Sequence, residues 1–591
     1  MKVIEVILAI AIILMPFPIS QSTIDFEKVK FSSIRISGTK EIKIDLEGTN
    51  SRVLEVGKPI LPMHIITRKF PIGTKILRID CIPNEIKTIK IHGKSIIAKG
   101  SCPFAKIEIK NEGIFPKKWY SYHIGVGIEN GRRLIFLTIE LHPVRYNAIK
   151  NEILYAKNFD ISIDYILPKN FLFTKDKYDF LIITPSEWKE ALIPLKEQKE
   201  NHGIKTIIVC LDDIYNGKYF ATQGRDEPEK IKYFIKDAIE QWGIKYVLLV
   251  GSHEKMPVRY TNLHDGLGGT GYISDLYYAD VYKYENGKIV FEDWDSNGNG
   301  IFAEWDENNV DVLDLYPDVY IGRLPCRNEF EVKTVIDKII NYEENTYGKK
   351  WFKRMIVCGG DTFADHYYMN THFYEGELIT QEALKYMKDF EAIKLWGTKR
   401  NLHTINIWLA LNKGAGFVYF SGHGTPFLWV AYSPYYYPLW IGLWGIWNLP
   451  FLFNGEKLPV VVLSGCATAQ FNLSIECISW WFVRKINGGS IATLGYTASP
   501  YGGIGDQDDD GIPDCIEYKC GYLEIQFFRL YGEENTSIIG NLWGNALTDY
   551  LNKFSIDWNG EIASETQKDC QIIEKWILFG DPTLKIGGYK S

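Results

Sequence analysis

The chain has 591 residues, of which 46% are hydrophobic, 24% charged and 14% aromatic, and its formal net charge is −7. This composition excludes a mainly disordered protein, because such chains contain few hydrophobic and aromatic residues. The length indicates three to five domains, and the negative charge argues against nucleic acid as the main partner.

The N-terminus has the order of a secretory signal peptide, which we assign to residues 1–22. Lys2 precedes an apolar stretch over residues 6–15, and small residues follow up to an expected cleavage site after Ser22. A membrane anchor is the alternative, but crossing a bilayer needs about 20 apolar residues and two prolines interrupt this stretch. We therefore expect a secreted or cell-surface protein with no stable membrane span after signal removal.

The chain contains ten cysteines, and an exported protein can join them as disulfides. Cys81 with Cys102, and Cys515 with either Cys520 or Cys570, are candidate pairs. Sequence alone does not fix the connectivity, so these pairs are expectations for the structure to test.

Residues 23–170 consist of short alternating runs with turn residues between them. Apolar and polar residues alternate over 41–46, and a second such run covers 134–139. Alternation with period two is typical of strands that are buried on one face. We predict a β-rich, mostly antiparallel N-terminal domain, which contains no cluster of catalytic residue types.

From Tyr178 onward, apolar strand-like runs alternate with helical stretches. The run 180–184 precedes a helix expected over 186–201, and a second helix is expected over 228–242. Strands that alternate with helices predict an α/β fold, in which helices cover both faces of a mostly parallel sheet.

A charged amphipathic helix within 326–350 divides this α/β region into two packed subdomains. We assign the first to residues 178–350 and the second to residues 351–591. Near the C-terminus, a long helix is expected over 567–579.

Two motifs lie 43 residues apart in the second subdomain. The run 417–421 ends before Gly422-His423-Gly424, and the run 460–464 ends before Gly465-Cys466. Residues just past the carboxyl ends of parallel strands line the ligand crevice of an open α/β sheet. A thiol needs a base or a positive neighbour to become nucleophilic near neutral pH. The motifs therefore predict a Cys–His hydrolase site.

Glycine next to a reactive residue allows the backbone to approach a substrate closely. The amides of Gly424 and Cys466 are candidates for an oxyanion hole, in which each donor is often worth about 3 kcal/mol. A structural His-Gly turn is the alternative for the first motif taken alone.

Two acidic loops have the spacing of a calcium-binding loop, with oxygen-bearing side chains at alternate positions and glycine at position 6. The first carries Asp506, Asp508, Asp510, Asp514 and Glu517. The second is a weaker match and carries Asp295, Asn297, Asn299 and Asp306. We expect structural Ca²⁺ and no organic cofactor, and the alternative for each loop is a solvated acidic turn.

The stretch 427–453 between the two motifs is rich in tryptophan and tyrosine. It is either a hydrophobic core insertion, a wall of the substrate groove, or a surface that contacts a membrane. If it forms the groove, Trp429 is our candidate for contact with substrate.

Four segments together resemble the gingipain-type cysteine peptidases of the broader caspase-like group. They are residues 421–424, 458–466, 579–584 and 320–325. The segment 57–62 is also similar to the β-rich propeptide of that family. The resemblance implies a caspase-like fold over 178–586, protein or peptide substrates, His423 as base and Cys466 as nucleophile.

The family also implies an acid that orients the histidine and, in arginine-specific members, an acidic pocket floor. Glu254 is our candidate for the first role, and an exposed loop glutamate is the alternative. Asp275 is the candidate for the second role, where it would select Arg or Lys, and a turn-capping aspartate is the alternative. The chain departs from the family pattern at Ala469, where a glycine is common.

We therefore predict a secreted cysteine endopeptidase that is made as a proprotein and stabilised by calcium. Self-cleavage near Lys169, Lys175 and Lys177 would release the β-rich domain. The rival from another class is a catalytically inactive, calcium-binding surface or adhesion protein with the same fold.

Overall fold

The computed structural model describes residues 22–100, 113–169, 173, 175–264, 271–363 and 372–590. The expected signal peptide up to residue 21 and Cys102 lie outside these ranges. No helix within them is long and apolar enough to cross a membrane.

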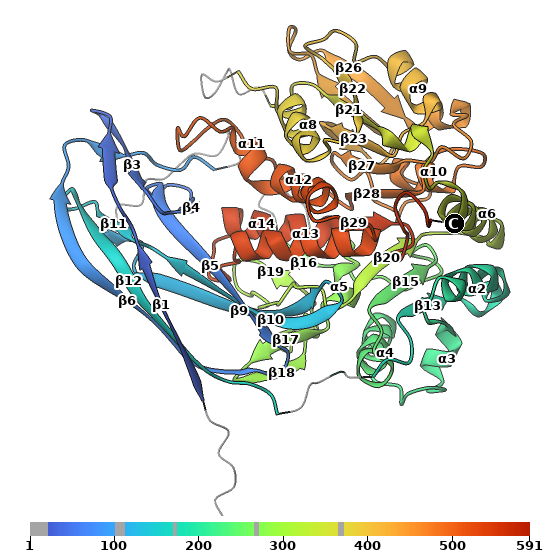
Figure 1. Cartoon of the computed structure of the whole chain (residues 1–591), viewed down its shortest axis with the longest axis horizontal. Helices are drawn as coiled ribbons and strands as arrows, with labels where there is room; N and C mark the ends of the chain where they lie inside the picture. The colour runs from blue at the N-terminus through green and yellow to red at the C-terminus, as the bar shows by residue number, and fades with distance from the viewer. Residues whose placement is uncertain are drawn as a thin grey trace, which may run out of the picture.

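The N-terminal region is a β domain, as predicted, and it occupies the left side of Figure 1. Its two larger sheets have the orders β1-β12-β11-β8, with β6 also paired to β12, and β4-β5-β10-β9. The strands are β1 (Thr23–Lys30), β4 (Ser51–Val53), β5 (Leu61–Pro71), β6 (Lys75–Lys90), β8 (Ile114–Phe115), β9 (Tyr120–Glu129), β10 (Arg132–Leu141), β11 (Val144–Asn147) and β12 (Glu152–Ile166). A small third sheet contains β2 (Ile34–Ser37), β3 (Glu41–Leu46) and β7 (Lys94–Ser95).

The rest of the chain is built on one ten-stranded sheet with the order β14-β13-β15-β20-β29-β28-β27-β23-β21-β22. All neighbouring pairs are parallel except β28 and β29. The strands are β13 (Phe180–Thr184), β14 (Thr206–Cys210), β15 (Tyr246–Val250), β20 (Tyr320–Leu324), β21 (Arg354–Gly359), β22 (Glu391–Trp396), β23 (Phe417–Ser421), β27 (Val460–Ser464), β28 (Ala492–Tyr496) and β29 (Trp576–Phe579). This confirms the predicted α/β class, and the sheet runs without a break through both expected subdomains.

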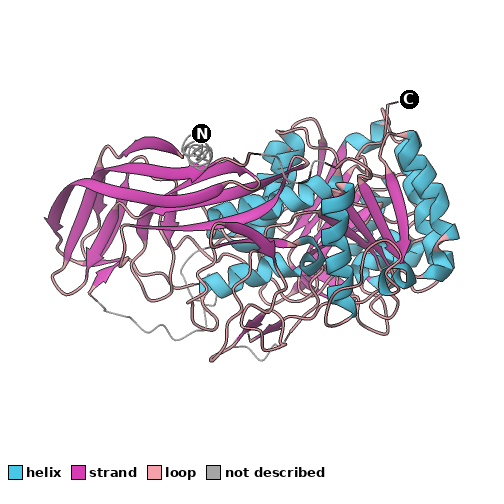
Figure 2. Ribbon diagram, turned by 90° about the horizontal axis from the view of Figure 1, so that it is seen from below, coloured by secondary structure: helices cyan, strands magenta, loops and turns pink. Residues whose placement is uncertain are grey.

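Helices cover both faces of this sheet, as Figure 2 shows on its right side. They are α2 (Ile193–Asn201), α3 (Leu211–Tyr215), α4 (Glu227–Trp242), α6 (Glu329–Asn345), α8 (Glu375–Tyr386), α9 (Thr404–Lys413), α10 (Ile478–Arg484), α12 (Lys519–Gly532), α13 (Ile539–Lys553) and α14 (Glu565–Lys575), with short turns at α5 (Leu276–Ala279) and α11 (Asp514–Glu517). Alternate residues of β23 show the two faces. Tyr419 belongs to the hydrophobic cluster that includes α12, whereas Phe420 belongs to the cluster that includes α9 and α10.

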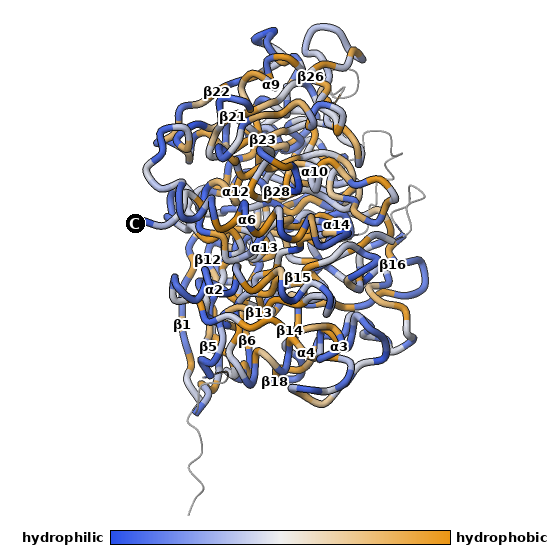
Figure 3. Tube along the Cα trace, turned by 90° about the vertical axis from the view of Figure 1, so that its right-hand side faces the viewer, coloured by the Kyte–Doolittle hydropathy of each residue, from blue (hydrophilic) through white to orange (hydrophobic). Residues whose placement is uncertain are grey.

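The central strands are buried along their whole length, which explains their continuous apolar sequence. Every residue of β23 and of β27 is buried, as expected for parallel strands covered on both faces. In Figure 3 much of the inner part of the chain trace is orange, and many of the outer loops are blue.

Two predicted helices have different bounds in the structure. The helix expected over 186–201 begins as two 3-10 turns, and its α-helical part starts at Ile193, next to Pro194 in the first turn. The helix expected over 567–579 ends at Lys575. Its last four residues form β29, because this apolar run pairs with both β20 and β28.

The expected disulfides within the described chain do not form. Cys81, Cys515, Cys520 and Cys570 are all buried free thiols. The proposed pairing of Cys515 with Cys520 or Cys570 is therefore wrong, and the Cys102 pairing lies outside the described residues.

Candidate active site

The two predicted motifs lie side by side at the carboxyl ends of neighbouring strands. β23 and β27 pair in parallel register, with Ser421 opposite Ser464. His423 and Cys466 each follow this pair by two residues. The register therefore places the imidazole and the thiol at the same edge of the sheet.

The backbones of the two motifs touch, so glycine is required at the contact. A Cβ atom added to Gly465 would lie 2.9 Å from the amide nitrogen of Gly424. A Cβ atom added to Gly424 would lie 3.2 Å from the amide nitrogen of Cys466. This close approach brings the two expected oxyanion donors into one small region, and their role stays a prediction.

His423 is oriented by a backbone carbonyl. Its Nε2 lies 2.7 Å from the carbonyl oxygen of Thr362, just beyond β21. A carbonyl oxygen only accepts hydrogen bonds, so neutral His423 must carry its proton on Nε2. Nδ1 is then the unprotonated nitrogen that can act as a base. Burial lowers the pKa of His423, and the bond to Thr362 partly opposes that effect.

Two aromatic rings pack around the imidazole. Tyr432 and Trp440 are stacked with 3.8 Å between ring centroids, and each ring meets His423 edge-on, at 5.0 and 5.3 Å. Trp440 remains 47% exposed, so it presents an apolar face beside the base.

Cys466 is the only described cysteine that is not buried. It is followed by a tight turn in which Ala467 has a φ of +56°. Ala469, which departs from the family pattern, is not among the residues with positive φ. A methyl group is therefore compatible with the backbone at that position.

A cavity of about 220 Å³ lies next to this turn. Ala467 and Phe471 line it from the nucleophile side, and Tyr260, Tyr272 and Ser499 line it from other loops. Its other lining residues are Gly271, Ile273, Gln470, Asn472, Thr497 and Ala498. The cavity is a candidate substrate pocket, and its described lining contains no carboxylate.

The structure does not bring Glu254 to His423. Glu254 is exposed after β15, and four strands separate β15 from β23 in the sheet. Because neighbouring strands lie about 4.8 Å apart, the two strands are about 24 Å from each other. We correct the expectation: the group that meets His423 is the Thr362 carbonyl.

Asp275 also has a different role from the expected one. Both of its carboxylate oxygens accept hydrogen bonds from Arg323, at 2.6 and 2.8 Å. Both side chains are almost fully buried. The charge of Asp275 is therefore already paired inside the protein, and we do not retain it as the acidic floor of a pocket.

Trp429 is part of the core and not an exposed groove wall. It is fully buried in β25 (Leu428–Tyr432), and its Nε1 donates to the carbonyl oxygen of Ser464. The stretch 427–453 combines core and surface, since Trp444 in β26 (Trp440–Gly445) is also buried, whereas Trp447 is 48% exposed.

The candidate calcium ligands of the acidic loop 506–517 lie in two overlapping groups, and their binding of an ion stays a prediction. Ligand oxygens of Asp506, Asp508 and Asp514 lie within 4.8 Å of one another, and so do those of Asp508, Asp510 and Glu517. The two groups share Asp508, which is 3% exposed and whose Oδ1 has no hydrogen-bond partner among the described residues.

The electrostatics of this loop suit a cation. Burial raises the pKa of Asp508 to about 6, that of Glu517 to about 7 and that of Asp514 to about 8. Neighbouring carboxylates add to each of these shifts. Crowded, partly desolvated oxygens of this kind gain from a divalent ion, so these residues fit Ca²⁺.

The second acidic loop is arranged differently from the expectation. The Nδ2 atoms of Asn297 and Asn299 donate to Glu304, and Asp306 instead caps the turn at Asn308. Asp295 pairs with Arg225. Within the described chain, no group of three carboxylate, histidine or cysteine ligands gathers in this loop.

Comparison with known proteins identifies relatives along most of the chain. The model of Peptidase family C25 matches residues 173–587. Gingipain R2 of Porphyromonas gingivalis is 21% identical to this chain, and the match covers 96% of this chain and 72% of the relative. Lys-gingipain of the same species is 20% identical and covers 82% of this chain and 27% of its own length.

Solved structures of this group also align. The Arg-specific cysteine proteinase gingipain R (RgpB) matches with a TM-score of 0.49 at 19% identity, over 71% of this chain and 80% of that one. The complex of RgpB pro- and mature domains from Porphyromonas gingivalis matches with a TM-score of 0.48 at 19% identity, over 69% of this chain and 79% of that one.

Proposed function

Because the chain belongs to Peptidase family C25 and is a cysteine endopeptidase, we propose that Cys466 is its nucleophile and His423 its base. The observation that carries this proposal is the register of β23 and β27, which places both side chains two residues past one strand pair. Cys466 is only half-buried whereas the other described cysteines are buried, and this difference supports the proposal.

The proposed reaction has two stages. Nδ1 of His423 takes the thiol proton, and the Cys466 sulfur attacks the scissile carbonyl carbon. The Gly424 and Cys466 amides hold the oxyanion, and the imidazolium then gives its proton to the leaving amine as the C–N bond breaks. Water hydrolyses the resulting thioester, gives a proton to Nδ1, and the thiol is restored.

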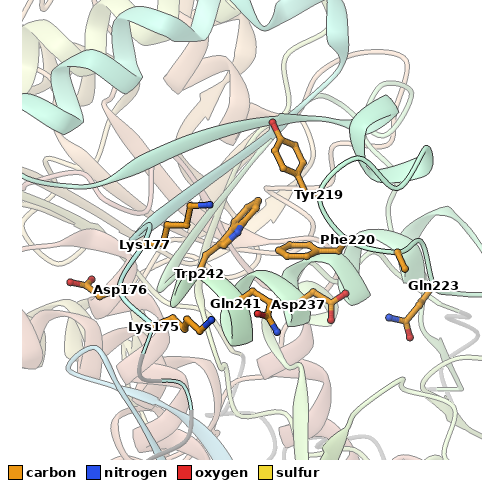
Figure 4. Close-up of a pocket in the computed structure, with 10 residues that line it drawn as sticks. Lys175, Asp176, Lys177, Tyr219, Phe220, Gln223, Asp237, Gln241 and Trp242 are labelled. Carbon is orange, nitrogen blue, oxygen red and sulfur yellow. The ribbon is translucent and has the colours of Figure 1, made fainter.

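The N-terminal β domain acts in this proposal as a propeptide on an exported proprotein. The connecting segment supports this, because Lys175 and Lys177 are exposed beside the open pocket in Figure 4. The Lys177 ammonium lies over the rings of Tyr178 and Trp242. A protease can reach such a segment without unfolding either domain.

Cleavage after Arg or Lys is the specificity to test first. Its support is the names of the relatives, which include Lys-gingipain and an Arg-specific proteinase. Asp275 does not supply that specificity, because Arg323 already pairs with it.

Calcium has a structural role in this proposal. Asp506, Asp508, Asp510, Asp514 and Glu517 would hold the ion, and its positive charge would offset their mutual repulsion. The loop lies next to the N-terminal domain, because Arg52 of β4 forms an ion pair with Asp508.

The rival function is a catalytically inactive surface protein with the same fold. Labelling with an irreversible, thiol-reactive peptide inhibitor separates the two functions. Modification of Cys466 alone, abolished in His423→Ala, supports the peptidase. Absent modification, or equal modification of several cysteines, supports the rival.

A further inference from the structure

A buried carboxyl group joins the three strands beneath the candidate dyad. Glu524 of α12 is fully buried. The hydroxyl of Tyr419 donates to its Oε2 at 2.5 Å, and the hydroxyl of Tyr496 donates to its Oε1 at 2.9 Å. The hydroxyl of Ser464 is a third hydrogen-bond partner.

These three hydroxyls come from neighbouring strands of the sheet. Tyr419 is on β23, four residues before His423. Ser464 ends β27, two residues before Cys466, and Tyr496 ends β28. One carboxyl group therefore joins the middle of β23 to the ends of β27 and β28.

We propose that Glu524 is a positioning residue for the reaction, which holds β23, β27 and β28 together so that His423 and Cys466 stay aligned. This inference rests on the proposed function of the dyad. Glu524 acts through Tyr419, Ser464 and Tyr496, and it does not touch substrate.

The charge state of Glu524 determines the direction of its hydrogen bonds, because all three partners are hydroxyl groups. An ionised carboxylate accepts from all three at once, whereas a protonated carboxyl must itself donate to an oxygen. Protonation therefore reverses one of these bonds, on a strand that carries the dyad or on the strand beside them.

Among the described residues, no positively charged group contributes to the pKa of Glu524. Cys520 lies one turn earlier on the same helix, and Cys515 lies near Tyr419. Cys520 lies close enough to Cys466 for the two side chains to interact electrostatically, so this part of α12 lies near the nucleophile. Burial raises the pKa of Glu524 to about 7, and the hydroxyl donors oppose that shift. The carboxyl therefore changes charge near neutral pH.

The test compares Glu524→Gln with the wild-type protein between pH 5.5 and 8.5. The glutamine has nearly the same size but cannot ionise. The readouts are the rate at which iodoacetamide alkylates Cys466, followed by mass spectrometry, and the kcat/KM for a peptide substrate. The ratio of wild-type to variant rates should rise about tenfold across this range, as expected when a charged hydrogen-bond acceptor is lost, with a midpoint near 7.

Asp549→Asn is the matched control. Asp549 on α13 is another partly buried acid, and burial raises its pKa to about 6. It pairs with Arg529 and not with a strand end. Its variant should change the melting temperature but leave the ratio independent of pH.

A flat ratio for Glu524→Gln would overturn the inference. If Glu524→Gln does not fold, Tyr496→Phe is compared with the wild-type protein instead. This variant loses one hydroxyl donor to the ionised carboxylate, so the pH step in its own rates should move above 7. An unmoved step would also overturn the inference. A wild-type protein that neither cleaves peptides nor reacts selectively at Cys466 contradicts the proposed function instead.

Discussion

Calcium removal should change how thermal stability depends on pH. In the metal-free protein, the pKa values of Asp508, Glu517 and Asp514 are raised to about 6, 7 and 8, first by burial. A raised carboxyl pKa means that the fold disfavours the charged form. The resulting destabilisation is absent below about pH 4, where the unfolded carboxyls are also protonated, and grows until about pH 8.

The structure gives the scale of this effect. Asp508 is 3% exposed, and its pKa rises from 3.8 to about 6. A shift of that size corresponds to about 3 kcal/mol between the two charge states. An ion bound only by the folded protein adds stability by mass action, about 4 kcal/mol when its concentration is 1,000 times Kd. At this calcium concentration and pH 8, the bound ion should therefore add more to the free energy of unfolding than the charged form of Asp508 removes.

Differential scanning fluorimetry at pH 5.5 and pH 8, with calcium or a chelator, tests this reasoning. The chelator should lower the melting temperature much more at pH 8, because protonated carboxyls bind calcium weakly at pH 5.5. Asp508→Asn should remove most of the difference. Asp509→Asn is the control, because Asp509 is exposed, lies outside both carboxylate groups and has a φ of +54° that asparagine tolerates. An equal chelator effect at both pH values, or equal behaviour of the two variants, would refute the calcium site.

Three further outcomes are expected. Cys466→Ala should lower kcat by about 10³-fold or more at nearly unchanged melting temperature, and substantial turnover by the purified variant would exclude Cys466 as nucleophile. The acid limb of kcat/KM should lie below pH 6.5, because burial lowers the pKa of His423 and the base is active when neutral; a limb above 6.5 would contradict this. Arg52→Ala should tighten calcium binding in a calorimetric titration by freeing the Asp508 oxygen, whereas weaker binding would mean that Arg52 orients this ligand.

Features that depend on a short stretch of chain could be predicted from the sequence. The strands β23 and β27 are continuous apolar runs that each end in small residues, which is the pattern of buried parallel strands. The loop 506–517 carries its five candidate ligands within twelve residues, so they lie close to one another along the chain. The glycines beside His423 and Cys466 could also be predicted as sites of close backbone approach. The structure shows the reason, because the contact between Gly424 and Gly465 excludes a side chain at both positions.

Features that depend on a distant partner could not be predicted in the same way. Asp275 resembled a pocket floor, but Arg323, 48 residues further on, neutralises it. The group that orients His423 is the Thr362 carbonyl, 61 residues earlier, and every residue has a carbonyl. The run 576–579 extended the helical pattern of α14, and only its pairing with β20 and β28 makes it a strand.

The same distinction explains why Glu524 has no sequence signal. A glutamate in an amphipathic helix usually faces solvent, and α12 contains no motif around this residue. Its environment arises because Tyr419, Ser464 and Tyr496 lie on three different strands that become neighbours only in the folded sheet. Reactive side chains are thus marked by the strand and glycine pattern beside them. The groups that hold those side chains in place are determined by the order of the strands, which links residues more than 100 positions apart.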